Sequence, residues 1–389
     1  MPLVAITTNA RRSDGRNAGQ EAARAALDKA GNRTPFLAMV FFSPDFPAQA
    51  VMNGVSNLLG NTPIWGFSTP YPFANGIPVP GSVSVALLFG DNLKAQTYWW
   101  PDFSRNRQEN GQKLVNTIES SLTPHKAVLL ASDGYTPDAD SICQSIHQEG
   151  LIVIGAVGCG SINNPKSVQM AGTQANSGGS AVAALQGKLS ITTAQSTGWL
   201  PVGRYFTVTA AEDGILMELD HQTPVDMFTS LFGQDEKSWS QPPLNELARL
   251  YPFSIETPSS AATTVLRSAV NVLPSGSFQL NGLVPLGQTA HLQIASRETC
   301  LQSARDAAQK ALEPWENKKP ALALVWIDMA YPLLLDSGDF PELTLIQEIL
   351  GKDIPIIGGY TLGQISRPDP SLPPVFQNQM IQITCMGDG

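Results

Sequence analysis

Hydroxyl side chains stand at the end of two apolar runs that each contain a glycine. Ser68 and Thr69 end the first run, and Tyr360 and Thr361 end the second. Open α/β sheets bind ligands at the carboxyl ends of their strands, where hydroxyl and free backbone N–H groups orient a small polar molecule. The same hydroxyl groups could instead cap the turn that follows. These four residues are therefore candidate ligand-binding residues with a structural alternative.

Three charged residues lie in or beside other apolar runs. Asp133 and Asp328 each follow an apolar run, where a carboxylate could face a cleft or hold a turn. Arg267 lies inside the strand-like run Val265-Leu-Arg-Ser-Ala-Val, where an unpaired charge would be costly to bury. Its guanidinium could receive a ligand carboxylate in a bidentate pair, or it could pair with one of the chain's own acids.

Catalytic signatures are few. The sequence contains no Gly-x-Ser-x-Gly elbow, HExxH pair, phosphate-binding loop or kinase signature. Cys159 lies between two glycines, where a loop thiol could be accessible as a nucleophile, but no base can be assigned to it. We therefore expect a protein without catalytic residues. An enzyme of unknown reaction with Cys159 as its nucleophile is the alternative.

Cysteine and histidine side chains could hold a metal or a haem. Cys143 and His147 are four residues apart on a predicted helix and so share one face. Two ligands do not make a structural zinc site, whereas a haem could take either side chain as an axial ligand. We predict no metal site, and haem stays open as a cofactor.

Composition argues against several classes of partner. The chain has 389 residues, of which 42% are apolar, and a net charge of −9 without any basic run, so we expect no nucleic-acid partner. Its most apolar stretch, residues 321–335, is interrupted by Asp328 and Pro332 and is too short to span a membrane. Four cysteines without a CxxC pair, and an N-terminus without a signal sequence, are typical of a cytoplasmic protein.

One unit recurs three times along the chain. It consists of a helix, an apolar strand, a second helix, a strand that contains a glycine, a loop and a closing strand. Continuous apolar strands separated by helices predict an α/β (α+β) fold with mixed sheets covered by helices. The glycines of the three copies are Gly66, Gly155 and Gly358.

The segment 189–296, between the second and third copies, has a different pattern. Alternating strands and turn signals dominate it, including a hairpin turn at Asp213-Gly214. We place a domain boundary near Thr223, which divides the chain into domains of residues 1–223 and 224–389.

Motifs in and after this segment resemble those of a known family. Gly198-Trp-Leu-Pro-Val-Gly203 is similar to the closing part of a FIST N-terminal domain, and the run from Gly276 to Gly282 is similar to the start of a FIST C-terminal domain. Gly358-Gly-Tyr-Thr-Leu-Gly-Gln364 resembles the final signature of that second domain. The order and spacing of these motifs cover most of the chain.

FIST domains are sensory modules, so the resemblance implies a cytoplasmic protein that binds a small molecule and passes its occupancy to a separate partner. It implies an amino-acid-like ligand, and a signalling partner such as a histidine kinase. Some family members look like haem-binding nitric oxide sensors, which makes a haem-binding gas sensor the alternative within the family.

Two departures from the family pattern bear on the ligand. Pro70-Tyr-Pro replaces the usual glycine-glutamate pair after Thr69, and Gln364 stands where the family commonly has glutamate. A ligand ammonium group would therefore lose two anionic acceptors. Gln364 can still accept a hydrogen bond through its side-chain carbonyl, although a neutral acceptor is roughly half as strong. Gln364 is therefore also a candidate ligand-binding residue.

Overall fold

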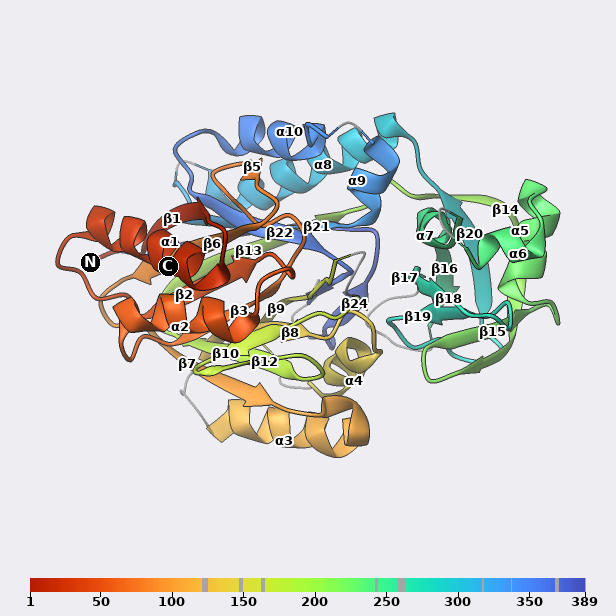
Figure 1. Ribbon diagram of the computed structural model, residues 1–389, viewed down its shortest axis with the longest axis horizontal. Coiled ribbons are helices and arrows are strands. Elements are labelled where there is room, and N and C mark those ends of the chain that lie inside the picture. The colour runs from red at the N-terminus through yellow and green to blue at the C-terminus, as the bar shows by residue number, and fades with distance from the viewer. Residues whose placement is uncertain are drawn as a thin grey trace.

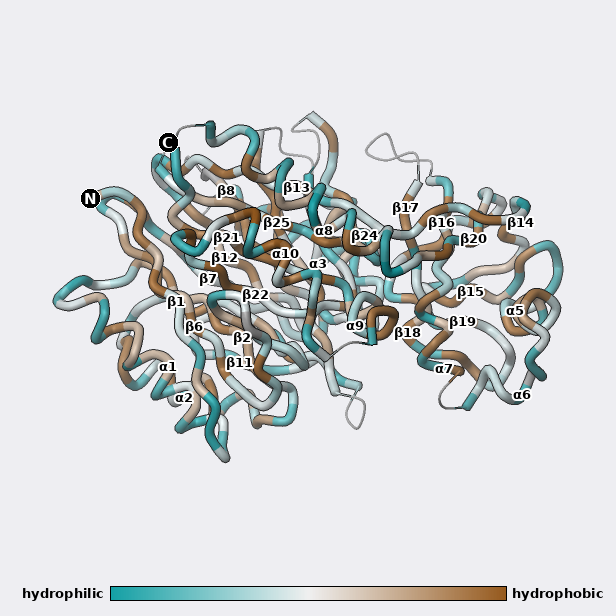
Figure 2. The backbone as a smooth tube through the Cα atoms, turned by 90° about the horizontal axis from the view of Figure 1, so that it is seen from above, coloured by the Kyte–Doolittle hydropathy of each residue, from teal (hydrophilic) through white to brown (hydrophobic). Residues whose placement is uncertain are grey.

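The structure, a computed structural model, has an α/β body of three similar units and a smaller lobe at one end of it (Figure 1). Both chain termini lie at the end of the body away from the lobe (Figure 2). The described residues are 1–120, 125–146, 150–161, 165–241, 244–257, 264–316, 318–336, 338–367 and 371–388.

The first unit shows how the sequence forms each layer. Helix α1 begins where the Asp14 carboxylate accepts the Asn17 N–H, and it buries a stripe of alanines that lets it lie close to the sheet. Strands β2 and β3 are continuous apolar runs because both of their faces are buried. The unit comprises β1 (Val4–Arg11), α1 (Gly15–Ala30), β2 (Leu37–Phe42), α2 (Ala48–Leu59), β3 (Ile64–Ser68), β4 (Phe73–Ala74), β5 (Ile77–Pro78) and β6 (Ser82–Phe89).

The other two units repeat this order, which confirms the predicted three copies and the α/β class. Each unit also has a strand before its leading helix that the sequence pattern did not predict. The second unit comprises β7 (Lys94–Trp100), η1 (Phe103–Asn106), α3 (Arg107–Ser120), β8 (His125–Ser132), α4 (Asp138–Ser145), β9 (Ile152–Val157), β10 (Gln169–Ala171), β11 (Gln174–Asn176) and β12 (Ser180–Gln186). The third comprises β13 (Leu189–Ser196), α8 (Arg297–Leu312), η3 (Glu313–Trp315), β21 (Leu322–Asp328), α9 (Ala330–Leu335), α10 (Pro341–Leu350), β22 (Ile356–Thr361), β23 (Gln364–Ser366), β24 (Val375–Gln377) and β25 (Ile381–Asp388).

The three units exchange hairpins in a closed ring. The sheets run β1-β6-β2-β3-β10-β11, β24-β23-β9-β8-β12-β7 and β13-β25-β21-β22-β4-β5. Each sheet therefore takes four strands from one unit and a hairpin from another: β10–β11 pairs with β3, β23–β24 with β9, and β4–β5 with β22. In each sheet the two central strands, β2–β3, β8–β9 or β21–β22, are parallel, and every other pairing is antiparallel.

The sheets face one another around a shared apolar core, and the helices cover their outer faces (Figure 1). Rings from the first and third units meet in this core, with the Trp326 centroid 6.3 Å from that of Trp65 and 6.1 Å from that of Phe67. There are three further apolar clusters, and each lies between one sheet and the helices of the same unit. Figure 2 shows the hydrophobic strands concentrated in the middle of the body.

At two of the three predicted glycines a side chain would collide with the backbone of the paired strand. A Cβ atom on Gly66 would lie 1.8 Å from the Val40 carbonyl oxygen, and one on Gly358 would lie 1.7 Å from the Val325 oxygen. Both distances are far inside van der Waals contact with backbone. These positions, which have the same register in their sheets, therefore admit only glycine.

The lobe is a seven-stranded sheet, in the order β17-β16-β20-β14-β15-β19-β18, with helices and a core of its own. It is inserted between β13 and α8, and the paired residues Leu200 and Ile294 lie where the chain enters and leaves it. None of the described helices is both long and apolar enough to cross a membrane. The lobe comprises β14 (Leu200–Glu212), β15 (Ile215–Leu219), α5 (Pro224–Phe232), α6 (Glu236–Trp239), α7 (Leu244–Leu247), η2 (Ala248–Leu250), β16 (Phe253–Glu256), β17 (Thr264–Arg267), β18 (Ala269–Val272), β19 (Phe278–Leu280) and β20 (Thr289–Ile294).

We predict that neither half of the chain folds alone when it is divided at residue 223. The fragment 1–223 would lose the partner of β13 and the hairpin that pairs with β9, and its own β4–β5 hairpin would have no strand to pair with. Each fragment should lack a cooperative thermal transition by circular dichroism, and co-expression of the two should restore one. A cooperative transition in fragment 1–223 by itself would contradict this.

Candidate functional site

The sequence-predicted site residues gather where the body meets the lobe. Strands β21 and β22 run in parallel toward the lobe, and the other two units place the ends of β2–β3 and β8–β9 at the same end of the body. All eight predicted residues are buried there, and none is more than 8% exposed. Which of them can meet a ligand depends on the hydrogen bonds that each one already makes.

The hydroxyl groups of the first unit connect it to the other two. The Ser68 hydroxyl donates to the Cys159 carbonyl at 2.9 Å and accepts the Val168 N–H at 2.9 Å. The Thr69 hydroxyl donates to the Tyr360 carbonyl at 2.7 Å. These bonds cross the boundaries between units, so both side chains have a structural role in this conformation.

Tyr360 points outward, into the apolar cluster beneath the helices of the third unit. Its hydroxyl donates to Oε1 of Glu342 on α10 at 2.6 Å. Burial raises the pKa of Glu342 above its ordinary value, and the hydrogen bond from Tyr360 only partly opposes this. Oε2 of Glu342 is buried without a hydrogen-bond partner among the described residues. A protonated, neutral Glu342 fits this environment best.

Thr361 and Gln364 face the neighbouring unit. Nε2 of Gln364 donates to the Thr361 hydroxyl at 2.8 Å, while Oε1 of Gln364 is buried without a partner in the described chain. Gln169 has the equivalent place in the hairpin of the second unit, and its Oε1 is unpartnered in the same way. The side-chain carbonyl of Gln364 is therefore open as an acceptor.

Asp133 and Asp328 occupy the same position in two units, directly after β8 and at the end of β21. Asp133 holds a turn, because its Oδ1 accepts the Tyr135 N–H at 2.8 Å. Burial raises the pKa of Asp133 above its ordinary value. Asp328 makes the same turn contact, since its Oδ1 accepts the Ala330 N–H at 2.9 Å, and it has a further partner, the guanidinium of Arg249, which comes from η2 of the lobe.

Arg249 is the residue that the sequence interpretation missed. Its Nη2 donates to both carboxylate oxygens of Asp328 at 2.8 and 2.9 Å and lies 3.3 Å from the Leu362 carbonyl. The side chain is 7% exposed, and that of Asp328 is fully buried. Arg249 lies in the apolar run Leu247-Ala-Arg-Leu-Tyr, which is the same signal that singled out Arg267.

Arg267 makes the second buried ion pair between lobe and body. Its Nη2 donates to both oxygens of Asp140 on α4 at 2.9 and 2.7 Å. Nε donates to the Leu283 carbonyl, and Nη1 donates to the carbonyls of Leu266 and Phe376. Every nitrogen of this guanidinium has an acceptor, as expected for the alternative in which Arg267 pairs with an acid of the chain.

Arg249 differs from Arg267 in the nitrogens that remain. Nε and Nη1 of Arg249 are buried and have no hydrogen-bond partner among the described residues. Beside them, Nε2 of Gln379 donates to the Arg249 carbonyl at 2.6 Å, and Oε1 of Gln379 is also unpartnered. The Gln379 N–H donates to Asp328 at 3.0 Å. Arg249, Asp328 and Gln379, which we call the Arg249 centre, thus combine free donors with a free acceptor.

Cys159 borders this centre. Burial raises its pKa to about 12, although the positive charge of Arg249 and a hydrogen bond from Tyr135 oppose the shift. The Tyr135 hydroxyl lies 4.0 Å from the sulfur and accepts the Gly160 N–H, and burial raises its own pKa above the ordinary value. Neither group supplies a base, so this geometry does not support Cys159 as a nucleophile.

Cys143 and His147 are the candidate metal or haem ligands of the sequence. Cys143 is buried in the cluster under α3 and α4, and burial raises its pKa well above the ordinary value. Its predicted partner His147 lies outside the described residues. Among the described residues, no three His, Cys, Asp or Glu side chains are grouped so that they could hold a metal ion.

Comparison with protein families identifies both halves of the chain. The family model of the FIST N domain matches residues 37–222, and that of the FIST C domain matches residues 225–367. The chain belongs to the FIST family. These matches confirm the resemblance found in the sequence. FIST domains are sensory domains of signal transduction, to which binding of small ligands is assigned.

Other comparisons are more distant. No curated protein sequence matches the chain. Among solved structures, a cyanuric acid hydrolase from A. caulinodans shares 10% identity over 47% of this chain and 70% of its own, with a TM-score of 0.27. A chorismatase shares 9% identity over 99% of both chains, with a TM-score of 0.37. At these scores the likeness carries no argument about the chemistry of the FIST chain.

The buried thiols should react slowly in the native protein. All four cysteines are buried, and at a pKa of about 12 only roughly one Cys159 in 10⁴–10⁵ is a thiolate at pH 7.5. Labelling with a disulfide reagent at pH 7.5 should therefore be complete in denaturant and at least ~100-fold slower without it. Fast native labelling of Cys159, traced by peptide mapping against Cys143, would instead favour the enzyme alternative.

Glu342 should make stability fall as the pH rises. Because its folded pKa is raised, the folded state binds this proton more tightly than the unfolded state does, and the resulting stabilisation is lost as the pH climbs from 4.5 through the folded pKa. Glu342→Gln keeps the acceptor for Tyr360 and removes the charge, so it should gain stability over the natural chain between pH 4.5 and 8. Urea unfolding at several pH values measures this, with the exposed Glu348→Gln on the same helix as control. A constant difference between Glu342→Gln and the natural chain at all pH values would contradict the assignment.

Proposed function

We propose that the chain is a cytoplasmic sensor that binds a small molecule with a carboxylate group at the Arg249 centre. The observation that carries this is the contrast between two buried arginines of the lobe. Arg267 has an acceptor for every nitrogen, whereas Nε and Nη1 of Arg249 have none in the described chain. Buried donors without acceptors cost roughly 1–3 kcal/mol each, and more when charged, so a ligand that supplies acceptors gains that energy on binding.

The free groups of the Arg249 centre define the ligand. The carboxylate of Asp328 balances the charge of Arg249, and the remaining N–H groups of the guanidinium suit a second carboxylate, supplied by the ligand. Oε1 of Gln379 and Oε1 of Gln364 can accept N–H groups. An amino-acid-like molecule offers both kinds of group. Glutamine in place of glutamate at position 364 favours a weakly basic or neutral donor over a strongly bound ammonium.

The position of the site connects binding to signalling. Arg249 comes from the lobe and Asp328 from the body, and further bonds cross the same boundary. Nδ2 of Asn281 donates to the carbonyls of Gly134 and Leu362, and Nε2 of Gln279 donates to the Tyr135 carbonyl. A ligand held between Arg249 and the body adds contacts to only one arrangement of the two parts, so its occupancy shifts the position of the lobe. A separate signalling protein, such as a histidine kinase, would read that position.

Ligand-dependent thermal stability tests this proposal. A ligand at about 100 times its dissociation constant adds roughly 2.7 kcal/mol to stability, which shifts the melting temperature measurably. We expect a shift with amino acids or short carboxylates in the natural chain. The double variant Arg249→Gln with Asp328→Asn should bind at least ~10-fold more weakly, since it removes the guanidinium without leaving an unpaired buried charge.

The matched control is Arg267→Gln with Asp140→Asn, which removes the other ion pair between lobe and body. It should lower stability without ligand but keep the ligand-induced shift. An equal loss of binding in both double variants would show that the lobe contact, and not the Arg249 centre, matters. No shift with any amino acid or short carboxylate in the natural chain would overturn the ligand class.

A further inference from the structure

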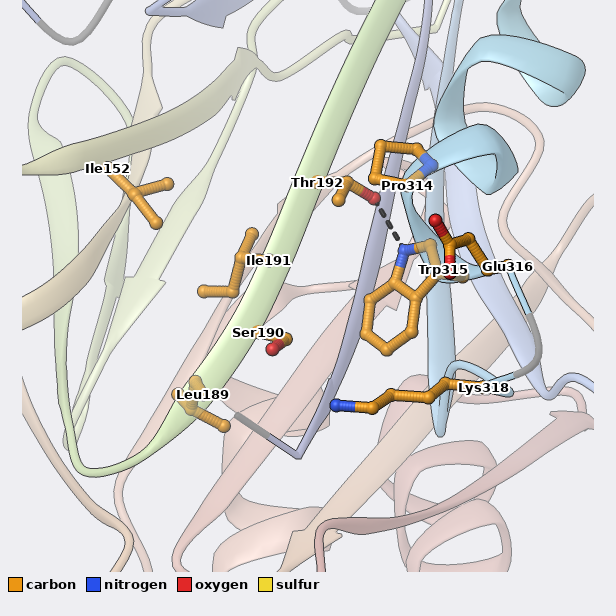
Figure 3. Close-up of a pocket in the computed structure, with 9 residues that line it drawn as sticks. All are labelled: Ile152, Leu189, Ser190, Ile191, Thr192, Pro314, Trp315, Glu316 and Lys318. Atoms are coloured by element: carbon orange, nitrogen blue, oxygen red, sulfur yellow. Dashed lines mark hydrogen bonds between the residues drawn. The ribbon is translucent and has the colours of Figure 1, made fainter.

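A second place in the body has the shape of a ligand site. A cavity of about 640 Å³ lies around the beginning of β13, between Ile152 of β9 on one side and the segment that follows α8 on the other (Figure 3). Parallel strands begin at the end of the body opposite the lobe, so this cavity is far from the Arg249 centre. Its volume is in the range of ordinary small-molecule pockets, which is roughly 300–1,000 Å³.

The cavity occurs where the third unit departs from the repeat. In the first two units the exchanged hairpin turns after two residues, and in the first unit this turn contacts the edge strand, since the Thr7 hydroxyl donates to Asn75 at 2.7 Å. In the third unit β23 and β24 are separated by residues 367–374. Arg367 of this connection bonds the carbonyls of Leu151 and Ile146, and no described residue of the connection lines the cavity.

The edge strand also changes at this corner. Ile191 pairs with Met386 at the register position where Ala5 pairs with Leu88 and Ala95 pairs with Leu185. Ile191 and Ile152 are only half-buried, and both line the cavity. At this register position the third unit therefore places an isoleucine beside an open space, where the first two units have alanine.

The remaining wall combines the aromatic ring of Trp315 with two charged side chains, those of Glu316 and Lys318. Nε1 of Trp315 donates to the Thr192 hydroxyl at 2.7 Å, which fixes the indole against the cavity (Figure 3). The Lys318 side chain extends across the opening toward β13 (Figure 3), and its ammonium has no hydrogen bond or ion pair within the described residues. The adjacent Lys319 does have a partner, Asp353, at 2.7 Å.

We propose that this corner cavity binds a carboxylate with an apolar ring or chain. The apolar part lies along the edge of β13, against Ile152 and Ile191 on one side of the strand and Trp315 on the other, and the carboxylate pairs with Lys318. Apolar burial supplies most of the affinity, and the exposed ammonium selects for the anion at a smaller, salt-dependent gain. This site is independent of the Arg249 centre, and it needs no movement of the lobe.

Binding of 2-naphthoate, with uncharged 2-naphthalenemethanol as its matched analogue, tests the proposal by calorimetry. We expect the natural chain to bind the naphthoate with a dissociation constant below about 1 mM. Ile191→Glu, which places a carboxylate beside Lys318, should weaken it more than ~10-fold. Lys318→Gln should weaken the naphthoate ~3- to 10-fold and leave the alcohol unchanged, while Lys319→Gln should change neither.

Each outcome decides the question. No binding at 1 mM naphthoate overturns the site, and binding that Ile191→Glu and Lys318→Gln leave intact places the molecule elsewhere and also overturns it. Thermal denaturation without ligand confirms that each variant is folded, and Lys318 is exposed enough to be replaced without loss of the fold. The Arg249→Gln/Asp328→Asn variant should bind the naphthoate normally, which separates this result from the test of the proposed function.

Discussion

The structure depends on one constraint: the second parallel strand of each unit would be an edge strand within its own unit, and its free edge must be paired. β3, β9 and β22 are continuous apolar strands whose outer N–H and C=O groups would otherwise lie at an open sheet edge. Each is paired with a hairpin from another unit, and the three exchanges close a ring. No unit can therefore be completed without the other two. The exchanged hairpins therefore link the three sheets into one body, although the family divides the chain into an N-terminal and a C-terminal domain.

This ring also explains why the polar residues at the strand ends are buried. The exchanged hairpins bring each unit's strand ends against its neighbour, so a hydroxyl at such an end meets a backbone carbonyl of another unit, as Thr69 meets Tyr360. If the three units were identical, the strand ends of all three would have the same surroundings. The lobe, inserted only in the third unit, breaks the symmetry by bringing Arg249 to Asp328. Both aspartates hold the turn that follows them, but Asp133 has no ion pair among the described residues. The chemistry of the site thus arises from the departure from the repeat.

The sequence predicted what depends on local pattern. The helices, the apolar strands and the glycines of the three copies follow from periodicity and from close backbone contact, which are encoded within a few residues. The hairpin exchange could not be predicted, because it pairs segments as far apart as β4 and β22, and no local signal marks such a pairing. Ser68 and Thr69 were found correctly at strand ends, but their partners lie in other units. Arg249 carried the same signal as Arg267, and only the three-dimensional contacts distinguish the two.

The two buried ion pairs contribute differently to the contact between lobe and body. A buried pair contributes little net stability, because the cost of removing both charges from water offsets most of their attraction. Arg267 and Asp140 reduce that cost by satisfying every nitrogen of the guanidinium, so their contact is complete without a ligand. In the pair of Arg249 and Asp328, Nε and Nη1 of the guanidinium have no acceptor among the described residues, so part of the cost of removing the charge from water is not offset. Under the proposed function, the first pair would orient the lobe, and the second would make the same boundary sensitive to a ligand that supplies the missing acceptors.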